Sequence, residues 1–281
     1  MRSGSTTPVH LKGFTVGAGA PLVLIAGPCV IEDRDGTFAI AERLKGIAAR
    51  LNIPFIFKAS YDKANRTSID GYRGPGLVEG LAVLARIKED LQVPVLSDVH
   101  RFEEIEPAAR VLDVVQIPAF LCRQTDFIMA VARAARVINV KKGQFLAPWD
   151  VAHIVEKVRR AGAGQLMLTE RGTTFGYNNL VVDFRALPVL RSFGFPVIFD
   201  ATHSVQLPGG VGSSSGGQRD MVPFLARAAV AVGVDGVFFE VHPDPDCALC
   251  DGPNSLRLSS LEGLLRELIA IDRALKTTRQ G

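Results

Sequence analysis

Pro21-Leu-Val-Leu-Ile25, soon followed by Gly27-Pro-Cys29, is the first of eight short apolar runs that decide the fold of this 281-residue chain. The other seven occupy residues 54–57, 94–97, 114–117, 137–140, 165–168, 196–199 and 237–239. Runs this short, rich in Val, Ile and Phe and separated by helix-like segments, are typical of buried parallel strands. Eight such units predict an α/β protein with a single (β/α)8 TIM barrel.

The segments between the runs carry a helical period. Residues 35–51 and 76–91 place apolar side chains three or four positions apart. Residues 148–161 begin at a proline and end before a glycine, and 256–275 are rich in Leu. We expect a short β-hairpin at 9–16, within an N-terminal extension over 1–20, to cap the barrel bottom. Nothing in the composition splits the chain, which predicts one barrel domain over 1–281.

Composition and charge limit the classes of partner and the cellular compartment that we expect for this protein. A net charge of +3, spread along the chain, is too small to favour nucleic acid. No apolar stretch approaches the roughly 18 residues of a membrane span, and residues 1–8 lack the apolar core of a signal peptide. Four cysteines in a chain this long do not indicate a disulfide framework. We expect a cytoplasmic protein that binds neither nucleic acid nor membrane.

Cations follow several of the expected strands, where a barrel builds its active site. They are Lys58, Lys63 and Arg66 after the second run, Arg123 after the fourth, Lys141 and Lys142 after the fifth, and Arg171 after the sixth. Converging cations repel one another unless an anion lies between them. Phosphate and carboxylate groups fit that role. The alternative, solvated loop charges paired with acidic neighbours, suits a single cation better than so many at strand ends.

A second group can hold a metal ion. Cys29, His203, Glu240 and Asp251 follow the first, seventh and eighth runs, which become neighbours when the barrel closes. A thiolate, an imidazole and two carboxylates can bind a divalent cation. The spacing is not a local motif, so the alternative is that Cys29 packs as a small residue and His203 donates hydrogen bonds.

Two local patterns carry less information. Cys247-Ala-Leu-Cys250 is a lone C-x-x-C without a second pair, and we interpret it as a coincidence in a loop. The glycine-rich run 209–217 lacks the Gly-Lys-Ser/Thr ending of a phosphate-binding loop. It could be a lid over the site or a surface loop.

With these residues in place, the chain resembles the 3-deoxy-D-manno-octulosonate 8-phosphate synthase family over residues 21–265. The resemblance is carried by residues 25–29, 58–68, 73–77, 116–125, 139–145, 169–172, 200–206 and 242–245. Lys-Ala-Asn-Arg at 63–66 also separates this family from the related aromatic-pathway synthase, which uses erythrose 4-phosphate and has a Lys-Pro-Arg-Thr pattern there.

The resemblance implies a transferase that condenses phosphoenolpyruvate with D-arabinose 5-phosphate and water. The products would be 3-deoxy-D-manno-octulosonate 8-phosphate, a precursor of the lipopolysaccharide inner core, and phosphate. Lys63, Lys141 and Arg171 would hold the phosphate and carboxylate of phosphoenolpyruvate. The pentose phosphate would be held by Asn65, Arg66, Thr67 and Arg123. The pocket between them would be lined by Lys58, Asp98, Gln116, Pro118 and Ala119.

The same resemblance bears on the metal. Cys29 matches the metal-dependent branch of the family, whose metal-free branch has Asn there, and His203, Glu240 and Asp251 match the other ligands. The run Cys250-Asp-Gly-Pro253 is more similar to the metal-free branch. We therefore expect a divalent ion (Zn, Mn, Fe or Mg), with His203 and Asp251 also among the catalytic residues together with Lys63, Lys141 and Asp98. The family further implies a homotetramer.

Two other classes of function stay open. A Schiff-base aldolase would use Lys58 or Lys141 as its nucleophile. A non-catalytic phosphosugar-binding barrel would bind both ligands without turnover.

Overall fold

The computed structural model describes residues 6–210 and 215–280 and shows a closed parallel barrel. Its eight strands are β3 (Val23–Gly27), β4 (Phe55–Lys58), β5 (Val95–Asp98), β6 (Val114–Ile117), β7 (Ile138–Lys141), β8 (Leu166–Glu170), β11 (Val197–Asp200) and β14 (Gly236–His242). They pair in this order, and β14 pairs with both β3 and β11, which closes the ring. The predicted (β/α)8 fold is confirmed.

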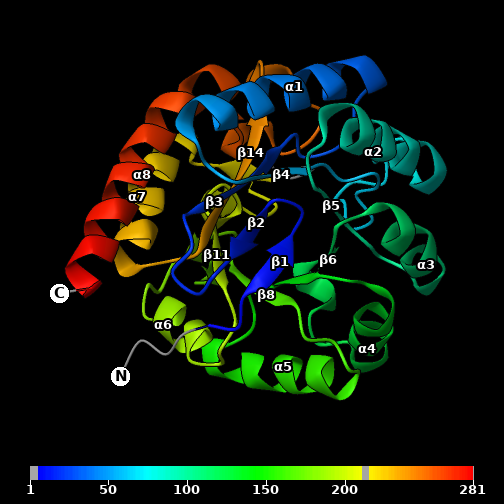
Figure 1. Ribbon diagram of the computed structural model, residues 1–281. Helices are drawn as coiled ribbons and strands as arrows, with labels where there is room; N and C mark the ends of the chain where they lie inside the picture. The colour runs from blue at the N-terminus through cyan, green and yellow to red at the C-terminus, as the bar shows by residue number, and fades with distance from the viewer. Residues whose placement is uncertain (1–5, 211–214, 281) are drawn as a thin grey trace.

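Helices surround the strands, as Figure 1 shows along the barrel. They are α1 (Arg34–Leu51), α2 (Leu77–Leu91), α3 (Phe102–Val111), α4 (Thr125–Ala134), α5 (Val151–Arg160), α6 (Ala186–Arg191), α7 (Val222–Val232) and α8 (Leu258–Gln280). Their buried faces form a large cluster with the outward-facing strand residues. None of the described helices is long and apolar enough to cross a membrane.

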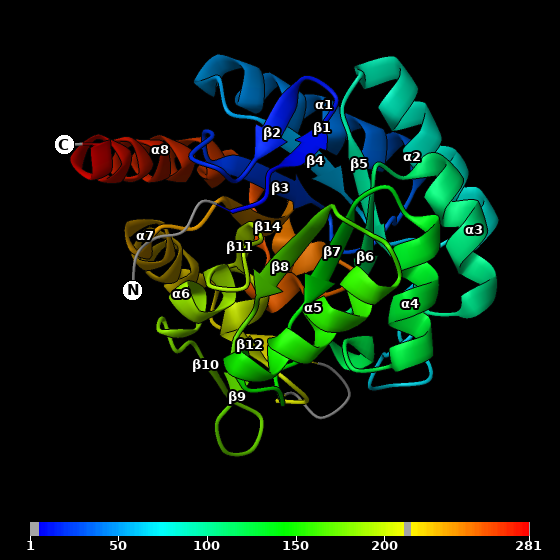
Figure 2. The same ribbon diagram turned by 60° about the horizontal axis from the view of Figure 1, so that its bottom comes forward.

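The N-terminal hairpin is present and caps one end of the barrel. Strands β1 (Val9–Leu11) and β2 (Phe14–Val16) pair antiparallel. Val9 and Val16 are fully buried and belong to the cluster that fills the barrel interior. In Figure 2 the hairpin lies at the opposite end from β9 (Thr173–Thr174), β10 (Leu180–Val181) and β12 (Gln206–Leu207). The hairpin therefore seals the floor and leaves the mouth at the other end.

The side chains that point into the barrel form two levels, because strand residues alternate sides with a period of two. The lower level is apolar and includes Ile56, Leu96 and Phe238. Two residues further along the same strands lie Lys58, Asp98 and Glu240, which are all buried. The other strands follow the same rule, with upper-level residues Gln116, Asn139, Thr169 and Asp200. A dry floor therefore supports a polar layer just below the mouth.

Most element ends lie within three residues of the sequence-based expectation, but the closing helix, expected to end at 275, continues to Gln280. Pro54 and Pro94 lack the N–H that a strand ladder needs, so β4 and β5 begin after them. The helix expected over 148–161 begins as a 3₁₀ turn at Pro148–Asp150, and α5 starts at Val151. Of the glycine-rich run, 211–214 lie outside the described residues, and Gly216–Gly217 (β13) pairs with β12. The short β15 (Leu256–Arg257) pairs in parallel beside the end of β14.

Gly27 occupies a place that no side chain can share. A Cβ there would lie 1.8 Å from the backbone oxygen of Lys58, and Gly27 pairs in register with Glu240. We predict that Gly27→Ala lowers the melting temperature sharply or prevents folding, because neighbouring strand backbone would have to move. Gly263→Ala is the matched control: its Cβ meets nothing within 4 Å, and alanine favours a helix by about 1 kcal/mol. Equal melting temperatures for Gly27→Ala and the wild type would contradict this assignment.

Candidate functional site

A cavity opens at the mouth of the barrel, and five of the seven cations expected there line it. Thirteen of the residues predicted for the site line this cavity. They are Lys58, Lys63, Asn65, Arg66, Thr67, Asp98, Gln116, Pro118, Ala119, Lys141, Arg171, His203 and Asp251. Cys29 and Glu240 lie against its wall, in contact with Asp251 and His203 respectively.

Glu240 is the central anion of the site. It is fully buried, and its Oε1 lies 2.9 Å from Lys58 Nζ, 3.8 Å from Lys63 Nζ and 3.5 Å from His203 Nε2. Burial raises the pKa of a carboxyl group, but the positive charges of His203, Lys58 and Lys63 outweigh it and lower the pKa of Glu240 to about 2. The carboxylate is therefore ionised at neutral pH.

Asp200, which sequence reasoning did not assign to the site, joins two of the predicted residues. Its Oδ2 lies 2.5 Å from Lys141 Nζ and 2.7 Å from His203 Nδ1. Burial raises the pKa of Asp200, but His203 and Lys141 hold it well below the usual range. Burial lowers the pKa of Lys141. Because the Asp200 carboxylate contacts Nδ1 of His203, the other ring nitrogen, Nε2, faces Glu240 and Asp251. Histidine ligands in metal sites are commonly held by a carboxylate in this way.

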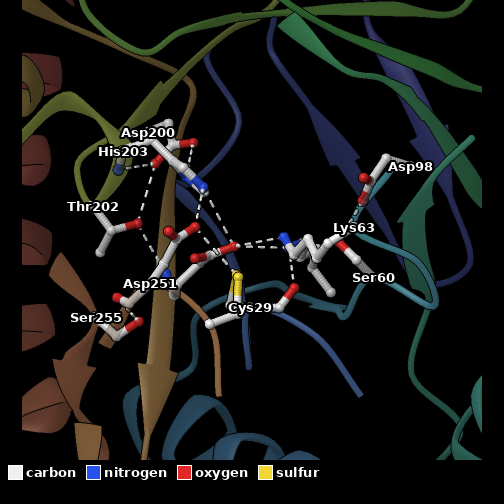
Figure 3. Close-up of polar contacts among 12 residues, drawn as sticks. Cys29, Ser60, Lys63, Asp98, Asp200, Thr202, His203, Asp251 and Ser255 are labelled. Atoms are coloured by element: carbon white, nitrogen blue, oxygen red, sulfur yellow. Dashed lines mark hydrogen bonds and ion pairs between the residues drawn. The ribbon is translucent and has the colours of Figure 1, made fainter. Parts of the chain in front are cut away.

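The predicted metal ligands meet around one oxygen of Asp251. Its Oδ2 lies 3.3 Å from Cys29 Sγ and 3.7 Å from His203 Nε2, and Figure 3 shows Cys29, His203 and Asp251 turned toward one another. An ion about 2.0–2.3 Å from each donor would separate tetrahedral neighbours by about 3.3–3.8 Å. Glu240 Oε2 is buried without a hydrogen-bond partner among the described residues. His203, Glu240 and Asp251 have donor atoms close enough together to share a divalent ion, and Cys29 contacts this group through Asp251.

Cys250 adds a second thiol to this group. Its Sγ lies 2.9 Å from Cys29 Sγ, and these two cysteines with Asp251 form a second possible set of metal donors. Burial is the main cause that raises the pKa of Cys29. A bound cation would stabilise its thiolate.

Two arginines line the cavity. Arg171 is buried, with Nη2 donating to Gln206 at 2.9 Å, while Nη1 has no partner among the described residues. Arg66 also lines the cavity, together with Asn65 and Thr67, and its Nη1 lies 3.0 Å from Cys250 Sγ. An unpaired buried guanidinium nitrogen is a strong reason to expect an anionic ligand.

Arg123 lies elsewhere. It borders a separate hollow between α4 and α5 with His153 and Lys157, and its backbone oxygen accepts a hydrogen bond from Lys157 Nζ. Within one chain it does not line the cavity of Arg66, so its role in phosphate binding stays a prediction. Lys142 also points away from the cavity, toward Glu170 and Thr173.

Other cavity residues were not singled out from the sequence, although a signal was present for some. His100 follows Asp98 by two positions, the strand period, and its Nε2 lies 3.1 Å from Asp98 Oδ2. Asp98 Oδ1 also accepts a 2.6 Å hydrogen bond from Ser60. The rest of the lining comes from Phe120, Gln144, Gln206, Pro208, Gly209, Ser215 and Cys250.

The fold and the site define a class: a TIM-barrel enzyme with a cationic mouth for anionic substrates and donors for a divalent ion. The chain belongs to the DAHP synthetase I family, which it matches over residues 6–277. It is 64% identical to the 2-dehydro-3-deoxyphosphooctonate aldolase of Desulfosudis oleivorans, covering 96% of this chain and 97% of the relative. The protein of the same name from Trichlorobacter lovleyi is 60% identical, covering 96% of this chain and all of the relative.

The His100–Asp98 pair predicts a dependence of stability on pH. Burial lowers the pKa of His100, but the hydrogen bond and charge of Asp98 outweigh it and raise that pKa. A raised histidine pKa means that the pair stabilises the fold fully below the unfolded value of about 6.5. The stabilisation is lost as pH rises through the folded value.

We therefore expect the wild type to exceed His100→Asn in melting temperature near pH 6, and the difference to shrink toward pH 9. Thermal unfolding of both proteins across this range is the measurement. A difference that stays constant with pH would show that the charge of His100 contributes nothing.

Proposed function

We propose that this chain condenses phosphoenolpyruvate with D-arabinose 5-phosphate and water to give 3-deoxy-D-manno-octulosonate 8-phosphate and phosphate. The observation that carries the proposal is the mouth itself, where five of the seven predicted cations line one cavity. The names of relatives that align along nearly the whole chain point to the same product. The product would be a precursor of the lipopolysaccharide inner core.

The cavity can separate two anionic substrates. Lys141 and Arg171, with Lys63, would bind the phosphate and carboxylate of phosphoenolpyruvate deep in the barrel. Arg66, beside Asn65 and Thr67 near the rim, would bind the pentose phosphate. Holding the two substrates face to face removes association entropy from the barrier.

The reaction needs charge to move, and the fixed cations would stabilise it. Carbon 3 of phosphoenolpyruvate attacks the sugar aldehyde, water adds at carbon 2, and phosphate leaves by cleavage of its carbon–oxygen bond. Fixed cations at Lys141 and Arg171 stabilise the departing phosphate. Asp200 would keep Lys141 and His203 in place throughout, since its Oδ2 contacts both.

We also propose that Cys29, His203, Glu240 and Asp251 hold a divalent ion. Such an ion would supply a Lewis acid that polarises the aldehyde or positions the water. The support is the convergence of the donors on Asp251 and the unpaired Oε2 of Glu240.

A Schiff-base aldolase is the second candidate, since burial lowers the pKa of Lys141 as such a nucleophile requires. Against it, both candidate lysines are ion-paired: Lys58 Nζ lies 2.9 Å from Glu240 and Lys141 Nζ 2.5 Å from Asp200. Charge stabilisation suits these contacts better than attack by a neutral amine. A non-catalytic barrel that only binds phosphosugars would not need the residues that could hold a divalent ion.

Assembly and compartment complete the proposal. We propose a homotetramer, with exposed aromatic side chains such as Phe145 and Trp149 available for contact with other copies. We place the protein in the cytoplasm, where thiols stay reduced, because all four cysteines are free.

The substrate assignment predicts a preference and a mutational effect. Phosphate release should be far faster with arabinose 5-phosphate than with erythrose 4-phosphate, and borohydride should trap no adduct. Arg66→Ala should raise mainly the KM for the pentose, since losing a charge-assisted contact costs about 1.5–3 kcal/mol. Arg34→Ala, whose partner is the surface residue Glu79, is the matched control. Equal turnover of both sugars would overturn the assignment, and an unchanged pentose KM would remove Arg66 from the phosphate site.

The metal assignment predicts that exhaustive chelation abolishes activity and that added Mn or Zn restores it. Cys29→Asn should lower the metal content, because an amide oxygen is a weaker ligand than a thiolate for such ions. If the remaining site works as in the metal-free branch, this variant keeps some activity in chelator. Elemental analysis beside the rate measurement separates the two effects. Full wild-type activity without metal would contradict the metal assignment and leave Cys29 with a packing role only.

A further inference from the structure

Two buried thiols from distant parts of the chain meet at the edge of the site. Cys29 follows β3 and Cys250 lies between β14 and β15, 221 positions later, yet their sulfur atoms are 2.9 Å apart. Both are free thiols. A disulfide has its sulfurs about 2.05 Å apart, so the pair needs to close by less than about 1 Å to form one.

The surrounding contacts hold the two segments together. The Leu249 amide donates a 2.8 Å hydrogen bond to Glu32 Oε1, which ties the segment of Cys250 to that of Cys29. Cys29, Val30 and Cys250 form a small buried cluster against Tyr72. The thiols are thus brought together by the fold, without a rearrangement of the barrel.

The sulfur of Cys250 is also placed for reaction. It lines the cavity, so a small oxidant that enters the mouth can reach it. Arg66 Nη1 donates a hydrogen bond to this sulfur at 3.0 Å.

We propose that Cys29 and Cys250 form a reversible disulfide modification site that takes a peroxide-class oxidant and competes with the divalent ion for Cys29. Cys250 attacks one oxygen of hydrogen peroxide, which breaks the O–O bond and gives a sulfenic acid and water. Cys29 then attacks the sulfenic sulfur, the S–S bond forms and a second water leaves. Two thiols lose two electrons and two protons, and one peroxide becomes two waters.

The disulfide removes a ligand from the site. The sulfurs of the disulfide are no longer thiolates. Cys29 could therefore not bind an ion until a dithiol had reduced the disulfide. A bound ion would in turn occupy Cys29 and slow the oxidation. The disulfide goes beyond the proposed function and needs no metal; only the protection by metal rests on the metal assignment.

The other two cysteines provide internal controls. Cys247 is exposed, and its Sγ donates to Asp244 Oδ2. The C-x-x-C spacing alone would pair Cys247 with Cys250, whereas the geometry pairs Cys250 with Cys29. Cys122 is buried beside Gly143, away from Cys29 and Cys250.

The test uses the full-length protein, treated with chelator and then with hydrogen peroxide. We expect the free thiols per chain to fall from four to two. The mass should fall by about 2 Da, and dithiothreitol should reverse both changes. Peptide mapping should identify a Cys29–Cys250 link. A Cys247–Cys250 link, or stable oxidation without any link, would overturn the proposal.

Two comparisons sharpen the result. Cys250→Ser should lose the link, while Cys247→Ser should form it at the wild-type rate; loss of the link in Cys247→Ser would overturn the pairing. Protein loaded with zinc should form the link at least about tenfold more slowly than the chelated protein. Equal rates in samples shown by elemental analysis to hold zinc would overturn the competition for Cys29. A sample that binds no zinc but forms the link contradicts the metal assignment alone and supports the disulfide.

Discussion

The buried carboxylate of Glu240 is the constraint on which the rest of the site depends. It lies at the end of β14, with Lys58, Lys63 and His203 all within 4 Å of one oxygen. Three positive or protonatable groups could not share so small a buried space without it, because like charges repel strongly away from water. Its register with Gly27 matters equally, since only a glycine leaves room beside the backbone of Lys58. The site therefore requires both the negative charge of Glu240 and the close approach of the backbones at Gly27.

Much of this arrangement could be predicted from the sequence, for a simple geometric reason. In a closed parallel barrel all strand ends meet at one rim. A polar residue at the end of an apolar run, such as Asp98, Gln116 or Lys141, is thereby placed in the mouth without further information. The hairpin over 9–16 was also predicted, from Thr15 and Val16 following Gly13, and β1 and β2 confirm it.

What could not be predicted depends on contacts between separate loops. The double contact of Asp200 with Lys141 and His203 requires the direction of each side chain, which the order of residues does not state. Arg123 follows β6 in the chain but turns toward α5 rather than toward the cavity. Cys250 was interpreted as part of a chance C-x-x-C, because its partner at position 29 lies at the other end of the chain.

Because the hairpin closes the bottom of the barrel, the mouth is the entrance for ligands. With Val9 and Val16 packed into the interior cluster, nothing can traverse the molecule from end to end. Whatever enters at the mouth must leave by the same route, so the ligand bound nearer the rim bars the exit of the one beneath it. With phosphoenolpyruvate bound deep and the pentose bound near the rim, as proposed above, the enol ether would have to bind first and the sugar second, and the long product would have to leave through the mouth before the next cycle.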